Sequence, residues 1–188
     1  MSVEEQKSEL RQQMLIKRAK YLRLSPMSKR QYDAEINNLL WQRIKYGDIN
    51  VIHCYLPMGS EIDILPLIKK LLHEGKTIIT PKTLKKPNLI NLQLNSLDDL
   101  EDGVFGTKHP RGHHVYKGDY DLIIVPGLAF DSDHYRLGYG GAYYDNFLKH
   151  HPNAMKLGIF YPFQKVEKVP VEGHDVRLDE IILKRHLF

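Results

Sequence analysis

At 188 residues the chain is long enough to bury a core of its own, so we expect one domain over residues 1–188 that needs no disulfide for stability. Its single cysteine, Cys54, has no partner within the chain, which favours a reducing compartment. The net charge of +4 is mild and the cations are scattered, which argues against nucleic acid as a partner. No apolar stretch reaches the roughly eighteen residues that span a bilayer, and the N-terminus is too charged for a signal peptide. We therefore expect a cytoplasmic monomer that binds neither membrane nor nucleic acid.

Apolar periodicity predicts helices and strands in alternation along the chain. A helix is expected over 3–24, with Ser2 and Glu5 in a capping box, and a second over about 28–46, ending near Gly47. After these we expect a strand over 50–56, a helix over 63–75, strands over 76–81, 88–94 and 121–130, a helix from about 143, a strand over 155–161 and an apolar strand pattern within 172–183. This order favours an α/β fold with a mostly parallel sheet, whose ligands lie at the carboxyl ends of the strands.

The stretch "RLGYGGAYYD", residues 136–145, follows an apolar run and precedes a predicted helix. Gly138, Gly140 and Gly141 would let the main chain approach an anion, at a position where backbone amides and the helix dipole favour one. The stretch is neither a Walker loop nor a G-x-G-x-x-G fingerprint, and a tight turn with glycines at positive φ is an equally consistent interpretation. Arg136 and Asp145 at its two ends favour the ligand site, because arginine binds phosphate and aspartate holds Mg²⁺. The tyrosines between them could stack on a heterocycle or fill the core.

The first helix carries three cations, Lys7, Arg11 and Arg18, inside the apolar arc that Leu10 and Met14 define in ideal helical geometry. They could be snorkelling side chains on a solvated face. A charge in the middle of a packing face needs a partner, however, and a bound polyphosphate would supply one.

Acidic residues in two further loops have both a structural and a functional interpretation. Glu61, in "YLPMGSEID" (55–63), is either a ligand acceptor or, with Asp63, an acid that complements a helix dipole, while Ser60 caps that helix. Asp175, in "EGHDVRLDEIIL" (172–183), is either a turn residue or a second acid for a metal. No G-x-S-x-G elbow is present and Cys54 lies within a predicted strand, so no protein nucleophile is expected.

Four segments together resemble the 5-formyltetrahydrofolate cyclo-ligase family: Lys7-x-x-x-Arg11, "YLPMGSEID", "VPGLAFDSDHYRLGYGGAYYD" (125–145) and "HDVRLDEIIL" (174–183). They occur in the family's order across nearly the whole chain. The resemblance implies a three-layer α/β/α fold and a ligase that closes 5-formyltetrahydrofolate, with or without a polyglutamate tail, to 5,10-methenyltetrahydrofolate. It implies ATP and Mg²⁺ as cofactors, release of ADP and phosphate, and a route through phosphorylation of the formyl oxygen and attack by N10.

Carried over residue by residue, the resemblance also assigns a site. Around ATP it places Lys7, Arg11, Arg136, Leu137, Gly138, Tyr139, Gly140, Gly141, Ala142, Tyr143 and Tyr144. Beside the folate it places Leu56, Glu61, Tyr139 and Tyr143; at Mg²⁺ it places Asp145 and Asp175; and Lys7 and Arg136 become the expected catalytic residues, because they would stabilise charge on the transferring phosphoryl group. The resemblance leads us to expect glycine where Ala142 and His134 stand here. His134 affects only the entry to the loop, whereas Ala142 leaves a nucleotide or folate binder without turnover as the alternative.

Overall fold

The computed structural model describes residues 1–85 and 87–184. Its helices are α1 (Val3–Leu24), α2 (Pro26–Lys45), α3 (Leu65–His73) and α4 (Tyr143–Leu148), with 3-10 turns η1 (Val104–Gly106) and η2 (Pro162–Gln164). Its strands are β1 (Val51–Cys54), β2 (Thr77–Thr83), β3 (Leu89–Leu94), β4 (Leu100–Asp102), β5 (Lys108–Pro110), β6 (Leu122–Val125), β7 (Ala129–Phe130), β8 (Arg136–Leu137), β9 (Met155–Ile159) and β10 (Glu180–Ile182). No helix in these two ranges is long and apolar enough to cross a membrane.

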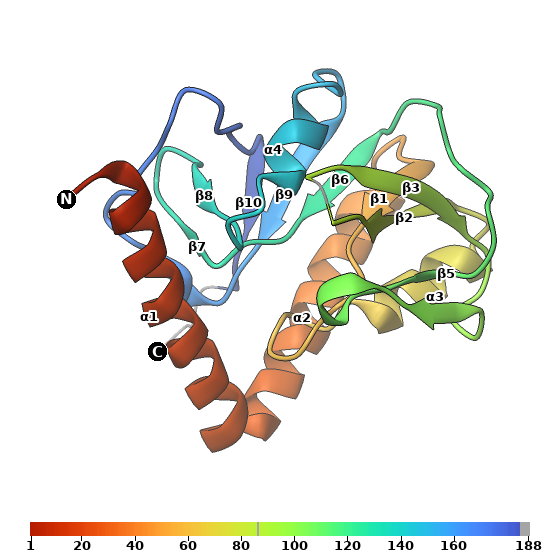
Figure 1. Cartoon of the computed structure of the whole chain (residues 1–188). Helices are drawn as coiled ribbons and strands as arrows, with labels where there is room; N and C mark the ends of the chain where they lie inside the picture. Colours follow the sequence, from red (N-terminus) through yellow and green to blue (C-terminus); the bar gives the residue numbers. More distant parts are fainter. Residues whose placement is uncertain (86, 185–188) are drawn as a thin grey trace.

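Six strands form the central sheet, in the order β10–β9–β6–β1–β2–β3 (Figure 1). Neighbouring strands pair in parallel, except that β3 is antiparallel to β2. From β1 the chain moves outward to β2, and from β6 it moves outward in the opposite direction to β9. The position between β1 and β6 is therefore a topological switch point, and the crevice beyond their carboxyl ends is where an open α/β sheet binds its ligands.

Helices cover both faces of this sheet. Ile52 and Ile124 belong to the core cluster that includes the buried faces of α2 and α3. Ile123 and Val125 point to the other face, where they belong to a cluster with Phe147 of α4. Adjacent residues of β6 thus pack into hydrophobic clusters on opposite faces of the sheet, because side chains alternate along a strand. The expected three-layer α/β/α arrangement with a mostly parallel sheet is confirmed.

The apolar run 121–130 is not one strand, contrary to the expectation from sequence. β6 ends at Val125 because Pro126 has no backbone N–H to continue the ladder. Gly127 then lies against the ring of Phe160, which a Cβ atom would approach to 2.7 Å. The chain turns there and resumes as β7, which pairs with β8 in a separate two-stranded sheet. This hairpin brings the 136–145 loop back over the carboxyl edge of the central sheet.

α1 lies apart from the sheet and packs against the β7–β8 hairpin (Figure 1). Its capping box is confirmed, and its buried side chains are Lys7, Met14 and Arg18, so two of the three cations lie on the packing face. The exposed residues include Leu15 and Ile16, which are 41% and 61% exposed. α1 therefore turns charge inward and some apolar surface outward, which means that polar contacts hold much of it in place.

A buried ion pair fixes α2 to the loop that follows β1. Asp33 of α2 accepts hydrogen bonds from Lys29 Nζ and from the hydroxyl of Tyr161, the latter at 2.8 Å. The backbone N–H of Asp63 donates to the same carboxylate, and Lys29 also donates to the carbonyl of Glu61 at 2.9 Å. The conformation of the 57–63 loop, and with it the position of Glu61, therefore depends on Asp33.

Replacing Asp33 by alanine should lower the free energy of unfolding by about 3–5 kcal/mol, because the Lys29 ammonium would remain buried without its carboxylate. Urea unfolding followed by circular dichroism measures this. The double variant Lys29→Met/Asp33→Leu is the control: it removes both charges and should lose less than the single variant. If Asp33→Ala lowers the free energy of unfolding by less than about 1 kcal/mol, Asp33 does not anchor the loop.

Candidate active site

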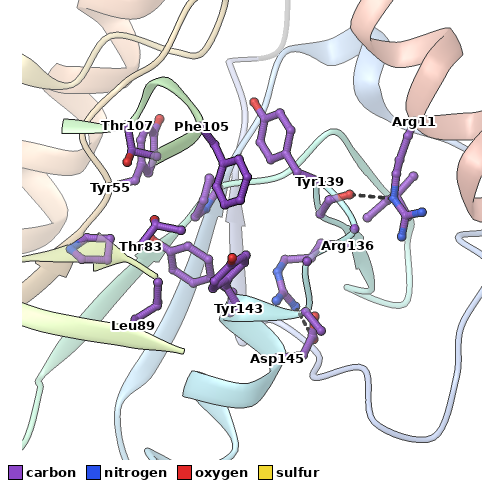
Figure 2. A pocket seen from close by; sticks show the side chains of 18 of the residues that line it. Arg11, Tyr55, Thr83, Leu89, Phe105, Thr107, Arg136, Tyr139, Tyr143 and Asp145 are labelled. Carbon is purple, nitrogen blue, oxygen red and sulfur yellow. Dashed lines mark hydrogen bonds and ion pairs between the residues drawn. The ribbon is translucent and has the colours of Figure 1, made fainter. Parts of the chain in front are cut away.

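A cavity of about 730 Å³ opens at the carboxyl edge of the sheet, at the switch point. Figure 2 shows its two sides: Arg11, Arg136 and Asp145 lie on one, and Thr83 and Leu89 on the other, with aromatic rings between them. The walls are built from α1, the loop after β1, the ends of β2 and β3, the β4–β5 hairpin, the 136–145 loop and the 172–175 segment.

Every residue assigned to the site from sequence lines this one cavity. They are Lys7, Arg11, Leu56, Glu61, Arg136, Leu137, Gly138, Tyr139, Gly140, Gly141, Ala142, Tyr143, Tyr144, Asp145 and Asp175. The structure thus brings together side chains up to 168 positions apart in sequence. Which ligand each of them contacts stays a prediction.

Sequence reasoning missed further lining residues, among them Glu4, Tyr55, Met58, Pro81, Thr83, Leu89, Phe105, Thr107, Lys108, Pro126, Glu172 and His174. Tyr55 and Pro126 directly follow β1 and β6, and Met58 lies in the loop after β1, so the strand-end rule could have found them. Phe105 and Thr107 could not be found in this way, because they come from the hairpin between β4 and β5, whose position over the sheet edge is a tertiary feature.

The cations on one side of the cavity are each paired with an acid. Lys7 Nζ lies 2.7 Å from both Glu172 Oε2 and Asp175 Oδ2. Burial lowers the pKa of Lys7, but the two carboxylates outweigh this effect and the pKa is raised overall. Arg136 Nη1 lies 3.1 Å from Asp145 Oδ1 and donates to the Val176 carbonyl.

Arg11 holds the glycine loop from the side of α1. Its Nε donates to the carbonyl of Gly138 at 3.2 Å, and its Nη1 pairs with Glu4 at 3.0 Å. A Cβ atom at Gly140 would lie 3.1 Å from the Arg11 guanidinium carbon, and Gly140 has a φ of +101°. The backbone conformation therefore favours glycine at position 140, and a larger residue would also push the Arg11 side chain aside.

The cavity also contains a buried carboxylate, which contacts Tyr139 of the 136–145 loop. Glu61 is only 6% exposed, and its Oε1 accepts a 2.7 Å hydrogen bond from the hydroxyl of Tyr139. Its Oε2 accepts from the backbone N–H of Met58 at 2.8 Å. Burial raises the pKa of Glu61, while these two hydrogen bonds and the charge of Arg18 partly offset that effect.

Ser60 does not cap a helix, contrary to one interpretation of the sequence. α3 begins at Leu65 with Ile64 as its N-cap residue, whereas the Ser60 hydroxyl accepts a hydrogen bond from Arg18 Nε at 3.0 Å. Asp63 is nearer the helix start, since its Oδ1 accepts from the backbone N–H of Leu65.

The side chains do not by themselves form a metal cage. Among the described residues, no group of three or more His, Cys, Asp or Glu could hold a metal ion. Asp145 and Asp175 instead provide single carboxylates beside Arg136 and Lys7. Mg²⁺ commonly takes one or two protein carboxylates and fills its remaining positions with water and phosphate oxygens, so this oxygen donor set fits that ion.

The single cysteine of the chain is not a candidate nucleophile. Cys54 is completely buried at the end of β1, and burial raises the pKa of its thiol to about 12. A thiol with such a pKa carries almost no thiolate near neutral pH.

A sequence profile of the 5-formyltetrahydrofolate cyclo-ligase family matches residues 3–184. The chain belongs to this family. A probable 5-formyltetrahydrofolate cyclo-ligase of Caenorhabditis elegans is 28% identical over 196 aligned positions, which cover 96% of this chain and 94% of that protein. The ligase class and the family expected from the motifs are confirmed.

Two solved structures of the same family have the same fold. The 5,10-methenyltetrahydrofolate synthetase of Aquifex aeolicus is 31% identical with a TM-score of 0.78, over 96% of this chain and 97% of that one. The 5,10-methenyltetrahydrofolate synthetase of Mycoplasma pneumoniae is 27% identical with a TM-score of 0.74, over 94% and 97% of the two chains. The fold expected from sequence is confirmed along nearly its whole length.

The two positions at which the resemblance to the family leads us to expect glycine, residues 134 and 142, both have a left-handed backbone. Ala142 has a φ of 51° and His134 a φ of 66°. A left-handed conformation costs an L-residue about 1–2 kcal/mol, which glycine avoids. His134 is held there by two contacts with Leu178: its carbonyl accepts from the Leu178 N–H, and its Nδ1 lies 3.2 Å from the Leu178 carbonyl. Ala142 immediately precedes α4, so its strain is stored in the loop that lines the cavity.

Replacing Ala142 by glycine should leave the free energy of unfolding unchanged or raise it by up to about 1 kcal/mol, because relief of the strained φ offsets the greater freedom of the unfolded chain. The matched control is Ala34→Gly on the exposed face of α2, which should lower the free energy of unfolding by about 1 kcal/mol. Urea unfolding of both variants measures the difference. Equal losses at the two positions would contradict the strain at residue 142.

Proposed function

We propose that the chain catalyses the ATP- and Mg²⁺-dependent cyclisation of 5-formyltetrahydrofolate to 5,10-methenyltetrahydrofolate, with release of ADP and phosphate. The observation that carries the proposal is a single cavity lined by paired cations and a glycine loop and also by a buried carboxylate with aromatic rings. One side suits a polyphosphate, and the other suits a flat ring whose N–H groups need an acceptor.

The charges of the polyphosphate side favour a nucleotide with its metal. Lys7, Arg11 and Arg136 are accompanied by four lining acids, which are Glu4, Asp145, Glu172 and Asp175. A bare polyanion would have to displace these acids, whereas a metal ion bound with it would give the acids a new partner. The balance of charge therefore supports a metal–nucleotide complex as the ligand.

Gly138 supports close approach of that ligand to the backbone. A Cβ atom there would meet nothing within 4 Å, and no positive φ is present, so the fold itself does not demand glycine. The residue lines the cavity. We assign to it the role of exposing the loop amides to phosphate oxygens, as glycine-rich loops do elsewhere.

The other side is assigned to the folate. Glu61 would accept hydrogen bonds from the amino-pyrimidine edge of the pterin, since each of its oxygens has a second lone pair beside the one already used. Tyr139 and Tyr143 would stack on the ring, with Leu56 beside them.

The chemistry follows from the weak electrophilicity of a formamide. The formyl oxygen must first become a leaving group, so it receives a phosphoryl group; N10 then attacks the activated carbon and phosphate leaves. Lys7 and Arg136 would stabilise the charge that grows on the transferring phosphoryl group. Mg²⁺, held by Asp145 and Asp175, would neutralise phosphate charge and orient the phosphates.

Mixing the pure protein with ATP, Mg²⁺ and 5-formyltetrahydrofolate tests this function. We expect the methenyl chromophore to appear together with one equivalent of ADP. A competing possibility is a protein that binds both ligands without turnover, which the strain at Ala142 makes worth testing. Binding of both ligands without product would refute the enzymatic function. A steep salt dependence of RNA or DNA affinity would instead support nucleic-acid binding.

Further expectations from the sequence belong to the same proposal. We propose a single functional domain over 1–188, a monomer, a cytoplasmic location and acceptance of polyglutamylated substrate. Sedimentation of the pure protein tests the monomer. Comparison of mono- and polyglutamylated substrates in the same assay tests the acceptance of polyglutamylated substrate.

Replacing Arg11 by alanine should weaken ATP binding roughly ten- to a hundredfold, equivalent to about 1.5–3 kcal/mol, because a charge-assisted contact to phosphate would be lost. Folate affinity should change little. Isothermal titration with each ligand measures both effects. Arg23→Ala, an exposed cation on the same helix, is the control. An ATP dissociation constant unchanged by Arg11→Ala would remove α1 from the nucleotide site.

Replacing Asp145 by asparagine should raise the Mg²⁺ concentration needed for half-maximal activity by about tenfold or more. The amide can keep the hydrogen bond from the Val176 N–H but lacks the charge that a cation requires. A Mg²⁺ titration at saturating ATP measures the shift, with the exposed Asp133→Asn as control. A titration curve like that of the wild type would return Asp145 to a purely structural role.

A further inference from the structure

Arg18 of α1 is a buried cation without a direct ionic partner. It is 5% exposed, and its two hydrogen bonds go to neutral groups, the hydroxyls of Ser60 at 3.0 Å and Tyr139 at 2.6 Å. Among the described residues, no carboxylate lies within 4.0 Å of it. Burial of a guanidinium is costly unless its charge is compensated, so the compensating group must act at longer range.

The anion that compensates Arg18 is Glu61, which is connected to Arg18 through the hydroxyl of Tyr139. The Tyr139 hydroxyl that accepts from Arg18 also lies 2.7 Å from Glu61 Oε1, and the Arg18 guanidinium lies 5.6 Å from the centre of the Tyr139 ring. Arginine can only donate hydrogen bonds. The Tyr139 oxygen accepts from Arg18, and the cation favours the orientation in which the hydroxyl proton points to Glu61 Oε1, so that Glu61 accepts.

We propose that Arg18 is a positioning residue, which acts through the hydroxyl of Tyr139 to keep Glu61 ionised and correctly oriented to accept hydrogen bonds from the substrate ring. This inference rests on the proposed function, in which that ring is a pterin. It also links α1 to the folate side of the cavity, so that one helix carries contacts for both ligands.

The hydrogen bonds from Arg18 to Tyr139 and from Tyr139 to Glu61 form a relay. Without Arg18, no cation favours the direction of its second hydrogen bond. A protonated Glu61 could donate to Tyr139 as readily as an ionised Glu61 accepts from it. Burial already raises the pKa of Glu61, and Arg18 is one of the groups that oppose this rise. Losing Arg18 would shift the pKa further upward. A protonated Glu61 no longer matches a ligand edge made of N–H donors.

The other groups around Glu61 do not replace Arg18. Tyr55 and Tyr144 are buried phenols whose pKa values are raised well above the ordinary value, chiefly by burial, so both stay neutral. Lys29 donates to the backbone carbonyl of Glu61, but its charge is already paired with Asp33. Arg18 is thus the one cation whose hydrogen bonds lead to the Glu61 carboxylate among the residues that the structure describes.

The substitution Arg18→Met should raise the KM for 5-formyltetrahydrofolate at pH 7 by roughly tenfold, with the KM for ATP and kcat changed by less than about threefold. Folate affinity requires ionised Glu61, so it falls as the pH falls through the pKa of that group. In Arg18→Met this fall should begin at higher pH than in the wild type. Arg18→Lys, which keeps the charge, should retain the wild-type pH profile. Lys17→Met, which removes an exposed cation from the same helix, is the control.

Tyr139→Phe keeps Arg18 but breaks the relay, and it should produce the same shift of the pH profile. The double variant Arg18→Met/Tyr139→Phe should then have a KM for 5-formyltetrahydrofolate no higher than that of either single variant. Each substitution alone already breaks the same chain of hydrogen bonds. Independent, additive losses, an unshifted profile, or a rise in the KM for ATP alone would overturn the proposal.

An NMR titration of the glutamate carboxyl carbons separates this inference from the proposed function. The Glu61 signal is identified by its loss in Glu61→Gln, and its pKa should be higher in Arg18→Met than in the wild type. Thermal unfolding of each variant checks that it is folded. If the wild type makes no methenyl product but the Glu61 pKa still rises, the function fails and the relay stands. If product forms and the pKa does not move, the relay fails and the function stands.

Discussion

The ion pairs of Lys7 with Glu172 and Asp175 connect the first turns of the chain to one of its last loops, and the cavity depends on that connection. α1 has little apolar surface to dock with. Complete burial of Met14 is worth about 1.5–3 kcal/mol, a small gain against the entropy of fixing a helix. Charged contacts must supply much of the rest, so any ligand that binds Lys7 also changes what holds α1. Occupancy of the site and docking of the helix are therefore thermodynamically linked.

The sheet supplies the rigidity that α1 lacks. Its central strands are almost completely buried on both faces, and the loops that follow β1 and β6 emerge side by side because the two strands are parallel neighbours. The 57–63 loop is anchored to α2 through Asp33, and the 136–145 loop is re-aimed by the β7–β8 hairpin. One side of the cavity thus depends on a buried polar network and the other on a short second sheet. Neither depends on the flexible reach of a surface side chain.

Local sequence signals predicted the main helices and strands and many of the residues that line the cavity, because both are encoded at short range. Apolar periodicity gave the order of helices and strands, and the glycines with Arg136 and Asp145 marked the loop. The break at Pro126 was missed because an apolar run conceals a turn, and Phe105 was missed because its place at the cavity depends on how a distant hairpin folds over the sheet. The partner of Arg18 was beyond prediction, since it lies 121 positions away.

Several energetically costly features lie at the carboxyl edge of the sheet. Glu61 is buried as an acid, Ala142 has a left-handed backbone, and Arg136 Nε is buried without a hydrogen-bond partner among the described residues. Each is unfavourable for folding alone, and the well-packed sheet offsets the cost. Such strain is typical of functional sites, because a group already desolvated and oriented need not be reorganised when a ligand arrives. The carboxyl edge thus loses folding stability because its groups are already arranged for binding.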